Sequence, residues 1–119
     1  MPGQDEFMHQ LEASLIFLNY DTKPELLVQG PLGANVTTFR LYRHINGRWD
    51  EVLNTVAHDL LIERRVTNGY HNIATACMTA VTLSEATFKF NGRRYSPHNC
   101  TVMEMGNPKA HKRHVPCGH

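Results

Sequence analysis

The clearest pattern along the chain is an alternation of apolar and polar residues from Val36 to Ile45. Phe39, Leu41 and Ile45 share one face with Arg43, while Thr38, Arg40, Tyr42 and His44 share the other. A period of two residues is typical of a half-buried strand. The pair Asn46-Gly47 follows directly and favours a tight type I′ turn, in which both central residues need positive φ.

A helical pattern follows this turn. Apolar residues recur at positions i, i+3, i+4, i+7 and i+8, namely Leu53, Val56, Ala57, Leu60 and Leu61. Asp50 and Glu51 suit the first turn of a helix, and Arg64 and Arg65 suit the last. The pattern predicts an amphipathic helix from about Asp50 to Arg65, which Asn68-Gly69 would end.

The remaining segments give weaker signals. Helical spacing predicts a helix over 5–18, with a buried strand from Ala13 to Asn19 as the alternative. Leu26 to Gln29 fits a short strand, and Asn72 to Leu83 fits either helix or strand. Ala86 to Ser96, interrupted by Asn91-Gly92, predicts a second hairpin, and Cys100 to Met105 a further strand.

Together these elements predict an α+β fold: a small antiparallel sheet built from two hairpins, with two or three helices packed on one face. We expect one globular domain over 1–105, followed by a basic, His-rich tail over 106–119. A length of 119 residues suits a single core.

Composition adds a polarity of charge. The formal net charge is only +1, but residues 1–39 carry five acidic side chains against Lys23, whereas 40–119 carry eleven Lys and Arg against six acidic side chains. Such a polarised distribution suits an acidic partner or nucleic acid, and it equally suits attraction within the domain.

Three cysteines, Cys77, Cys100 and Cys117, cannot all form disulfides within one chain. The polar N-terminus has no signal-peptide pattern, and the longest apolar run is far shorter than a membrane span. We therefore expect a cytoplasmic protein with reduced thiols and no membrane partner.

A first candidate site is a nucleic-acid or partner interface in the C-terminal third of the chain. Cationic and aromatic side chains together can hold phosphates and stack on bases. The candidates are Arg93, Arg94, Tyr95, Lys109, Lys112 and Arg113. The alternative is a charged surface that keeps an edge hairpin from aggregating.

A second candidate is a zinc site in the tail. Imidazole and thiolate are the ligands that zinc prefers, and the tail offers His111, His114, Cys117 and His119, with Cys100 as a more distant ligand. The alternative is a solvated tail without metal.

A third candidate is thiol catalysis by His44 and Cys100. Tyr42-Arg43-His44 and Tyr95-Ser96-Pro97-His98-Asn99-Cys100 resemble the histidine box and Asn-Cys motif of the lecithin:retinol acyltransferase-like family. The resemblance implies a cysteine nucleophile activated by a histidine. The chain departs from the family because no tryptophan follows His44 and Cys100 begins a strand-like segment. The alternative is a small buried cysteine.

We expect a binding protein that recognises a protein or nucleic-acid partner through its surface, in preference to an enzyme. Tyr42, His44 and Trp49 form a second candidate patch, in which Trp49 is either an exposed anchor or a filler between hairpin and helix. A chain of this size often completes its sheet edges by self-association, so a homodimer is also expected.

Overall fold

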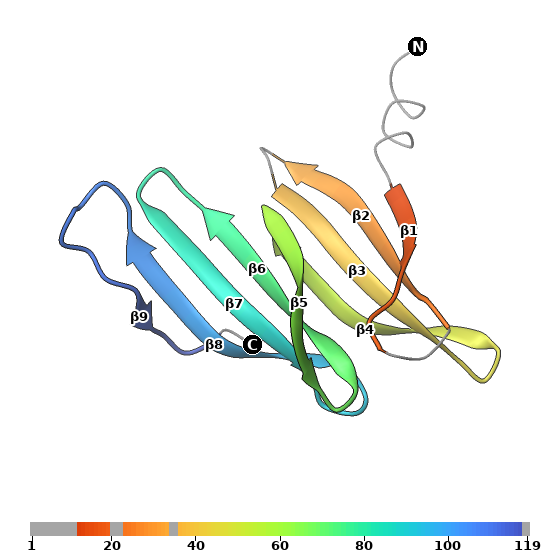
Figure 1. The fold of residues 1–119 in the computed structure, drawn as a ribbon. Helices are drawn as coiled ribbons and strands as arrows, with labels where there is room; N and C mark the ends of the chain where they lie inside the picture. Colours follow the sequence, from red (N-terminus) through yellow and green to blue (C-terminus); the bar gives the residue numbers. More distant parts are fainter. Residues whose placement is uncertain (1–11, 20–22, 34–35, 118–119) are drawn as a thin grey trace, which may run out of the picture. The chain divides into compact units, whose positions relative to one another are not determined.

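The computed structural model describes residues 12–19, 23–33 and 36–117, and within them it contains nine β-strands and no helix (Figure 1). The chain divides into two compact units, Met1–Val56 and Ala57–His119, and each is described by itself. Each unit is built around an antiparallel sheet.

The first sheet has the strand order β1-β2-β3-β4. Its strands are β1 (Glu12–Ile16), β2 (Glu25–Gly33), β3 (Val36–Ile45) and β4 (Arg48–Ala57). The register pairs Leu27 with Leu41 and Gln29 with Phe39, so their side chains share one face. Leu27, Phe39 and Leu41 are buried there together with Leu18, and this face forms the core of the unit.

The loop after β1 is anchored by a buried carboxylate. Glu25 is 3% exposed, and its Oε1 accepts a hydrogen bond of 2.9 Å from the backbone N–H of Leu18. Leu18 itself is fully buried. The bond satisfies a backbone donor that would otherwise be left without a partner on burial, and it ties Leu18 to the start of β2.

The second sheet has the strand order β5-β6-β7-β8-β9, with each strand antiparallel to the next. Its strands are β5 (Asp59–Thr67), β6 (Tyr70–Met78), β7 (Thr82–Phe90), β8 (Tyr95–Glu104) and the two-residue β9 (Arg113–His114). Ile73, Phe90 and Tyr95 are its largest buried side chains. The Tyr95 hydroxyl donates a hydrogen bond of 2.7 Å to the carbonyl of His71, which satisfies its polar end.

The predicted α+β class is wrong, because the described residues are all-β. The segment predicted as a helix from Asp50 to Arg65 forms β4 and most of β5 instead. Its helical spacing is coincidental: Leu53 and Ala57 are buried, but Val56 is 42% and Leu61 65% exposed, so the five apolar residues do not share one buried face. Asn68-Gly69, read as a helix stop, is a hairpin turn, with φ of 51° and 83°.

Several local predictions are confirmed. The strand Val36–Ile45 has the predicted bounds, and Asn46 and Gly47 have the positive φ values, 51° and 79°, that their turn requires. The second hairpin exists as β7 and β8.

Of the helix predicted over 5–18, residues 12–16 form the strand β1 instead, and residues 5–11 lie outside the described residues. The ambiguous segment from Asn72 to Leu83 lies in β6, a turn and the start of β7.

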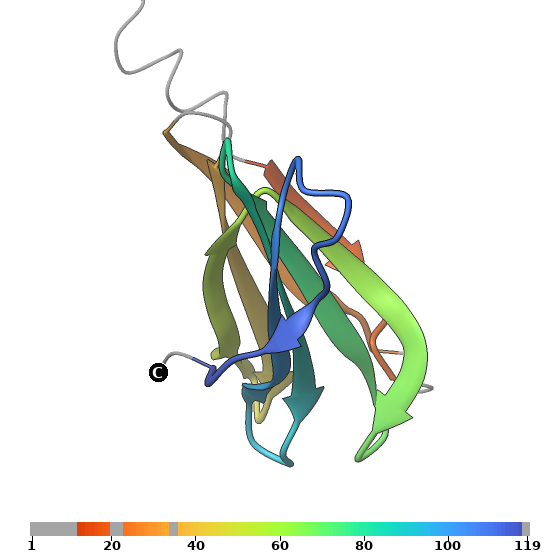
Figure 2. The same cartoon turned by 90° about the vertical axis from the view of Figure 1, so that its left-hand side faces the viewer.

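A disulfide fixes the tail to the second sheet. Cys100 in β8 is bonded to Cys117, with 5.3 Å between their Cα atoms. The short strand β9, which precedes Cys117 in the sequence, pairs with β8 (Figure 2). The backbone N–H of Val115 adds a hydrogen bond of 2.9 Å to the carbonyl of Cys100. The expectation of reduced thiols is therefore wrong for this pair, whereas Cys77 forms no disulfide within the described residues. A search of the described residues for a helix able to cross a bilayer finds none.

A matched pair of leucines distinguishes this fold from the one expected. Leu41→Ala should lower the free energy of unfolding by about 2–5 kcal/mol, because a fully buried side chain leaves a cavity. Leu61→Ala should change it by about 0.5 kcal/mol or less, because that side chain is mostly solvated. Urea unfolding measures both. A large loss for Leu61→Ala would support the helical alternative.

The disulfide predicts a second stability effect. Replacing Cys100 and Cys117 together by Ser should lower the free energy of unfolding by about 3 kcal/mol, because a loop of this size is no longer closed in the unfolded chain. Tryptic cleavage after Lys112, which is exposed, should become faster at the same time. Thiol titration of unreduced, denatured wild-type protein should find one thiol, and three would contradict the bond.

Candidate functional site

The turn between β7 and β8 presents two arginines. The Asn91 Oδ1 accepts hydrogen bonds from the backbone N–H groups of Arg93 (2.9 Å) and Arg94 (3.0 Å), and the Asn91 N–H donates to the Arg94 carbonyl (2.9 Å). Asparagine favours such turns because its short side chain reaches the backbone two residues on. The turn is therefore ordered, and both arginine side chains are exposed.

The turn between β5 and β6 lies at the same end of the sheet. The Asn68 Nδ2 donates a hydrogen bond of 2.8 Å to the carbonyl of Phe90, which directly precedes the other turn. The Tyr70 and Phe90 rings pack with 4.2 Å between their centroids. Two hairpin turns that are 22 residues apart in sequence are thus joined side by side.

Two further arginines come to this end through a break in β5. The pairing of β5 with β6 shifts register between Ile62 and Val66, and Arg64 and Arg65, both exposed, lie in that irregular stretch. Lys89 lies opposite Ser96 just before the β7–β8 turn and is half-buried. We call these five residues the basic end of the second sheet: Arg64, Arg65, Lys89, Arg93 and Arg94.

The register sets the spacing within the basic end. Arg65 directly precedes the Val66↔His71 pair, and Lys89 directly follows Phe88 of the Ile73↔Phe88 pair, so β6 lies between the strands that carry them. Strands two positions apart are separated by about 10 Å. Tyr70 is half-buried, and its ring packs on Phe90, which directly precedes the β7–β8 turn.

Few acidic side chains lie near the cations of the basic end in the sequence. Segments 63–72 and 88–98 carry these five cations and a single carboxylate, Glu63. No side chain of the described residues forms an ion pair with any of the five. Unpaired guanidinium groups on an ordered scaffold can donate bidentate hydrogen bonds to phosphate or carboxylate oxygens without first breaking an internal pair.

The structure separates the six residues of the predicted interface. Arg93 and Arg94 lie at the basic end, whereas β9 pairs with β8 at Thr101 and Val102, seven residues from Tyr95 and thus roughly 20 Å along the strand. Lys112 pairs with Glu85 (2.6 Å), and Arg113 lies 3.9 Å from Glu104.

The other two residues of that set behave differently. Tyr95 is 3% exposed and packs against Phe90, so its ring is not open for stacking on a base. Lys109 lies in an exposed turn, where its N–H donates to the Asn107 Oδ1 (3.0 Å). The sequence analysis missed Arg64 and Arg65, because it assigned them to a helix end. The signal that could have found them was the second Asn-Gly pair of the chain, Asn68-Gly69, interpreted as a hairpin turn.

Cys100 of the candidate catalytic pair has no thiol. Cys100 is held in the disulfide, so its sulfur is not a thiolate in this structure, and only a thiolate is an effective nucleophile. His44 lies in the first unit, where its ring packs against Trp49 with 4.9 Å between centroids.

The four candidate zinc ligands of the tail differ in their surroundings. Cys117 is in the disulfide, His111 and His114 are exposed, and His119 lies outside the described residues. In the described part of the chain, no three or more His, Cys, Asp or Glu side chains are grouped closely enough to hold a metal ion.

The aromatic patch of the first sheet is partly open to solvent. Trp49 is 45% exposed, so it is not a filler against a helix. Tyr42 and His44 lie on the same face of the sheet as Trp49. Tyr42 also lines a hollow of about 320 Å³ on this face. The hollow is lined by Val28, Gly30, Pro31, Thr38, Arg40 and Tyr42.

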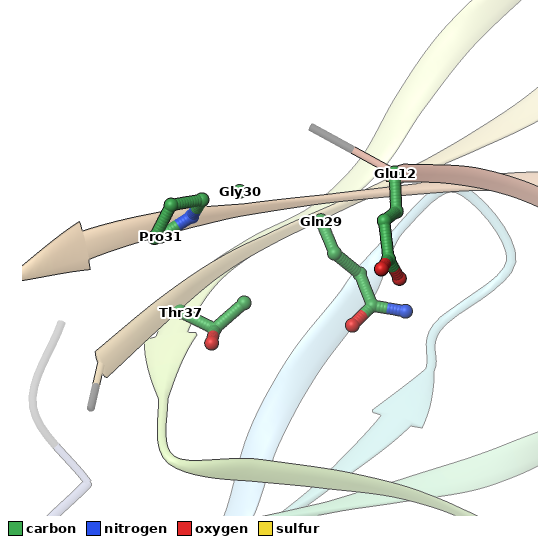
Figure 3. A pocket seen from close by; sticks show the side chains of 5 residues that line it. All are labelled: Glu12, Gln29, Gly30, Pro31 and Thr37. Atoms are coloured by element: carbon green, nitrogen blue, oxygen red, sulfur yellow. The ribbon is translucent and has the colours of Figure 1, made fainter. Parts of the chain in front are cut away.

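A second hollow, of about 400 Å³, lies on the opposite face of the first sheet. Figure 3 shows the Glu12 carboxylate and the Gln29 carboxamide extending to the same side, as their pairing in the ladder requires. Its described lining residues contain no His, Cys or Ser.

No family model, curated protein or solved structure matches the chain significantly.

Proposed function

We propose that this chain is a binding protein that holds the phosphate backbone of a single-stranded nucleic acid at the basic end of the second sheet. The observation that carries the proposal is the convergence of five cations from two separate sequence segments, none of them paired to an acidic side chain of the described residues. Phosphate contacts of this kind supply most of the affinity of sequence-independent nucleic-acid binding.

The charge of the whole unit supports the same partner. Residues 57–119 carry eight Lys and Arg against four Asp and Glu, a net charge of +4, while residues 1–56 carry four against seven, a net charge of −3. Long-range attraction of a polyanion is therefore directed to the second unit.

A single strand is favoured by the ring that accompanies the cations. Tyr70 is half-buried on Phe90, beside the two joined turns of the basic end. Aromatic rings beside a positively charged surface stack with unpaired bases, whereas a duplex keeps its bases inside. An acidic protein segment is also negatively charged and would compete for the cations. It would have no bases to stack on Tyr70.

Double substitutions at the basic end test the proposal. Arg64→Ala/Arg65→Ala and Arg93→Ala/Arg94→Ala should each weaken binding of a fluorescent 12-nucleotide oligo-dT at 50 mM salt by about tenfold or more, because each removes two phosphate contacts. Their melting temperatures should stay close to that of the wild type, since all four side chains are exposed. Fluorescence anisotropy measures the affinity.

The tail supplies the matched control. Lys112→Ala/Arg113→Ala removes two cations that are engaged with Glu85 and Glu104, and its affinity should stay within about twofold of the wild type. Four or five phosphate contacts predict that wild-type affinity falls about 50- to 130-fold from 50 to 200 mM salt. No binding at 50 mM salt, or an equal loss from the tail variant, would contradict the proposal.

A further inference from the structure

The four outer edges of the two sheets differ in how they are protected against pairing with another strand. β5 carries Arg64 and Arg65 in an irregular stretch, and β4 carries Arg48, Asp50 and Glu51. The β8 edge is covered in part by β9, and its remainder contains Pro97 and the positive-φ residue Asn99. Charges, proline and bulges are the devices by which proteins protect edge strands.

The edge strand β1 has almost none of these devices. Its sequence is Glu12-Ala13-Ser14-Leu15-Ile16, with no proline, no cation and no register shift against β2. It lies at the outer edge of the first sheet (Figure 1). Among the described residues no strand pairs with its outer side, so a row of backbone donors and acceptors is left there for another strand.

The side chains of β1 add an apolar surface beside this edge. Leu15 is 60% exposed. The register places it in one cross-strand row with Leu26 of β2 and Tyr42 of β3, on the outer face of the sheet. Extension of the sheet beyond β1 would continue this row and remove Leu15 from water, which favours association.

We propose that β1 pairs with β1 of a second copy of this chain, antiparallel and symmetric about Ser14, which joins two first sheets into one. The partner is a second copy because β1 is complementary to itself in this register. Ser14 pairs with Ser14 of the second copy, Ala13 with Leu15, and Glu12 with Ile16, so all five residues of the strand are paired. A symmetric contact of this kind closes on itself as a dimer.

The register also avoids a repulsive contact. The two Glu12 side chains come to opposite ends of the paired strands, four residues and about 13 Å apart along the strand. A two-fold axis at Ala13 or Leu15 pairs only three of the five residues. A five-residue contact is small for an interface, so we expect a dissociation constant in the micromolar range.

Cysteine crosslinking tests the register. Ser14→Cys should form a disulfide-linked dimer on mild oxidation, because residues directly opposite in an antiparallel pair have Cα atoms about 4.5–5.5 Å apart, within the range that a disulfide spans. Glu12→Cys is the matched control and should link no more than the wild type, in which Cys77 is the cysteine outside the Cys100–Cys117 disulfide. Equal crosslinking of both variants, or none from Ser14→Cys, would overturn the proposal.

Association without a crosslink is measured by sedimentation equilibrium. Leu15→Lys should make the protein monomeric at about 100 μM, because a charge then lies at the paired edge. Leu61→Lys, at a leucine of similar exposure on β5, should leave the dimer intact. A monomeric wild type, or a dimer that survives Leu15→Lys, would refute the pairing. Neither variant touches the basic end, so oligonucleotide binding tests the proposed function separately.

Discussion

The hydrogen bond from the Asn68 carboxamide to the Phe90 carbonyl holds together the part of the molecule on which the functional argument depends. Asn68 also takes the positive φ that the β5–β6 turn requires, with Gly69 beside it. Asn68 therefore forms part of the β5–β6 turn and also connects this turn to the β7–β8 turn. The Tyr70–Phe90 ring contact and the Tyr95–His71 hydrogen bond lie directly beneath and fix the same two turns.

Because the two turns are joined, cations that are distant in sequence become neighbours in space. Arg64 and Arg65 precede one turn, and Arg93 and Arg94 lie in the other. Bringing like charges together raises the electrostatic energy of the folded state, and no acidic side chain of the described residues pairs with them to offset it. The tail is different, since Lys112 and Arg113 lie beside Glu85 and Glu104. An uncompensated cluster on an ordered scaffold is suited to an external anion.

The sequence predicts local turns and strands of this chain better than its class. Alternation from Val36 to Ile45 and two Asn-Gly turns were sufficient to place β3 and the β7–β8 hairpin. The segment from Asp50 to Arg65 misled the prediction because Val52 and Leu53 are both buried, which breaks the alternation of β4, and the next strand has a register shift of its own. Because both β4 and β5 depart from strict alternation, their apolar residues together have the spacing of a helix.

The candidate site was predictable only in part, for a related reason. Arg93 and Arg94 follow an Asn-Gly pair and were found, but a search limited to neighbours in sequence joined them to the tail. The contribution of Arg64 and Arg65 depends on pairing of β5 through β6 to β7, which is a long-range property of the sheet. The burial of Tyr95 depends on Phe90 and His71, which also lie across strands.

The most direct test of the account is a titration of ¹⁵N-labelled protein with an unlabelled oligo-dT, followed by two-dimensional NMR. Because binding at the basic end changes the surroundings of both joined turns, the account predicts that the amide shifts of residues 64–70 and 89–96 move together with one affinity. Shifts that are confined to one turn, or that centre on the tail from Lys109 to His114, would contradict it.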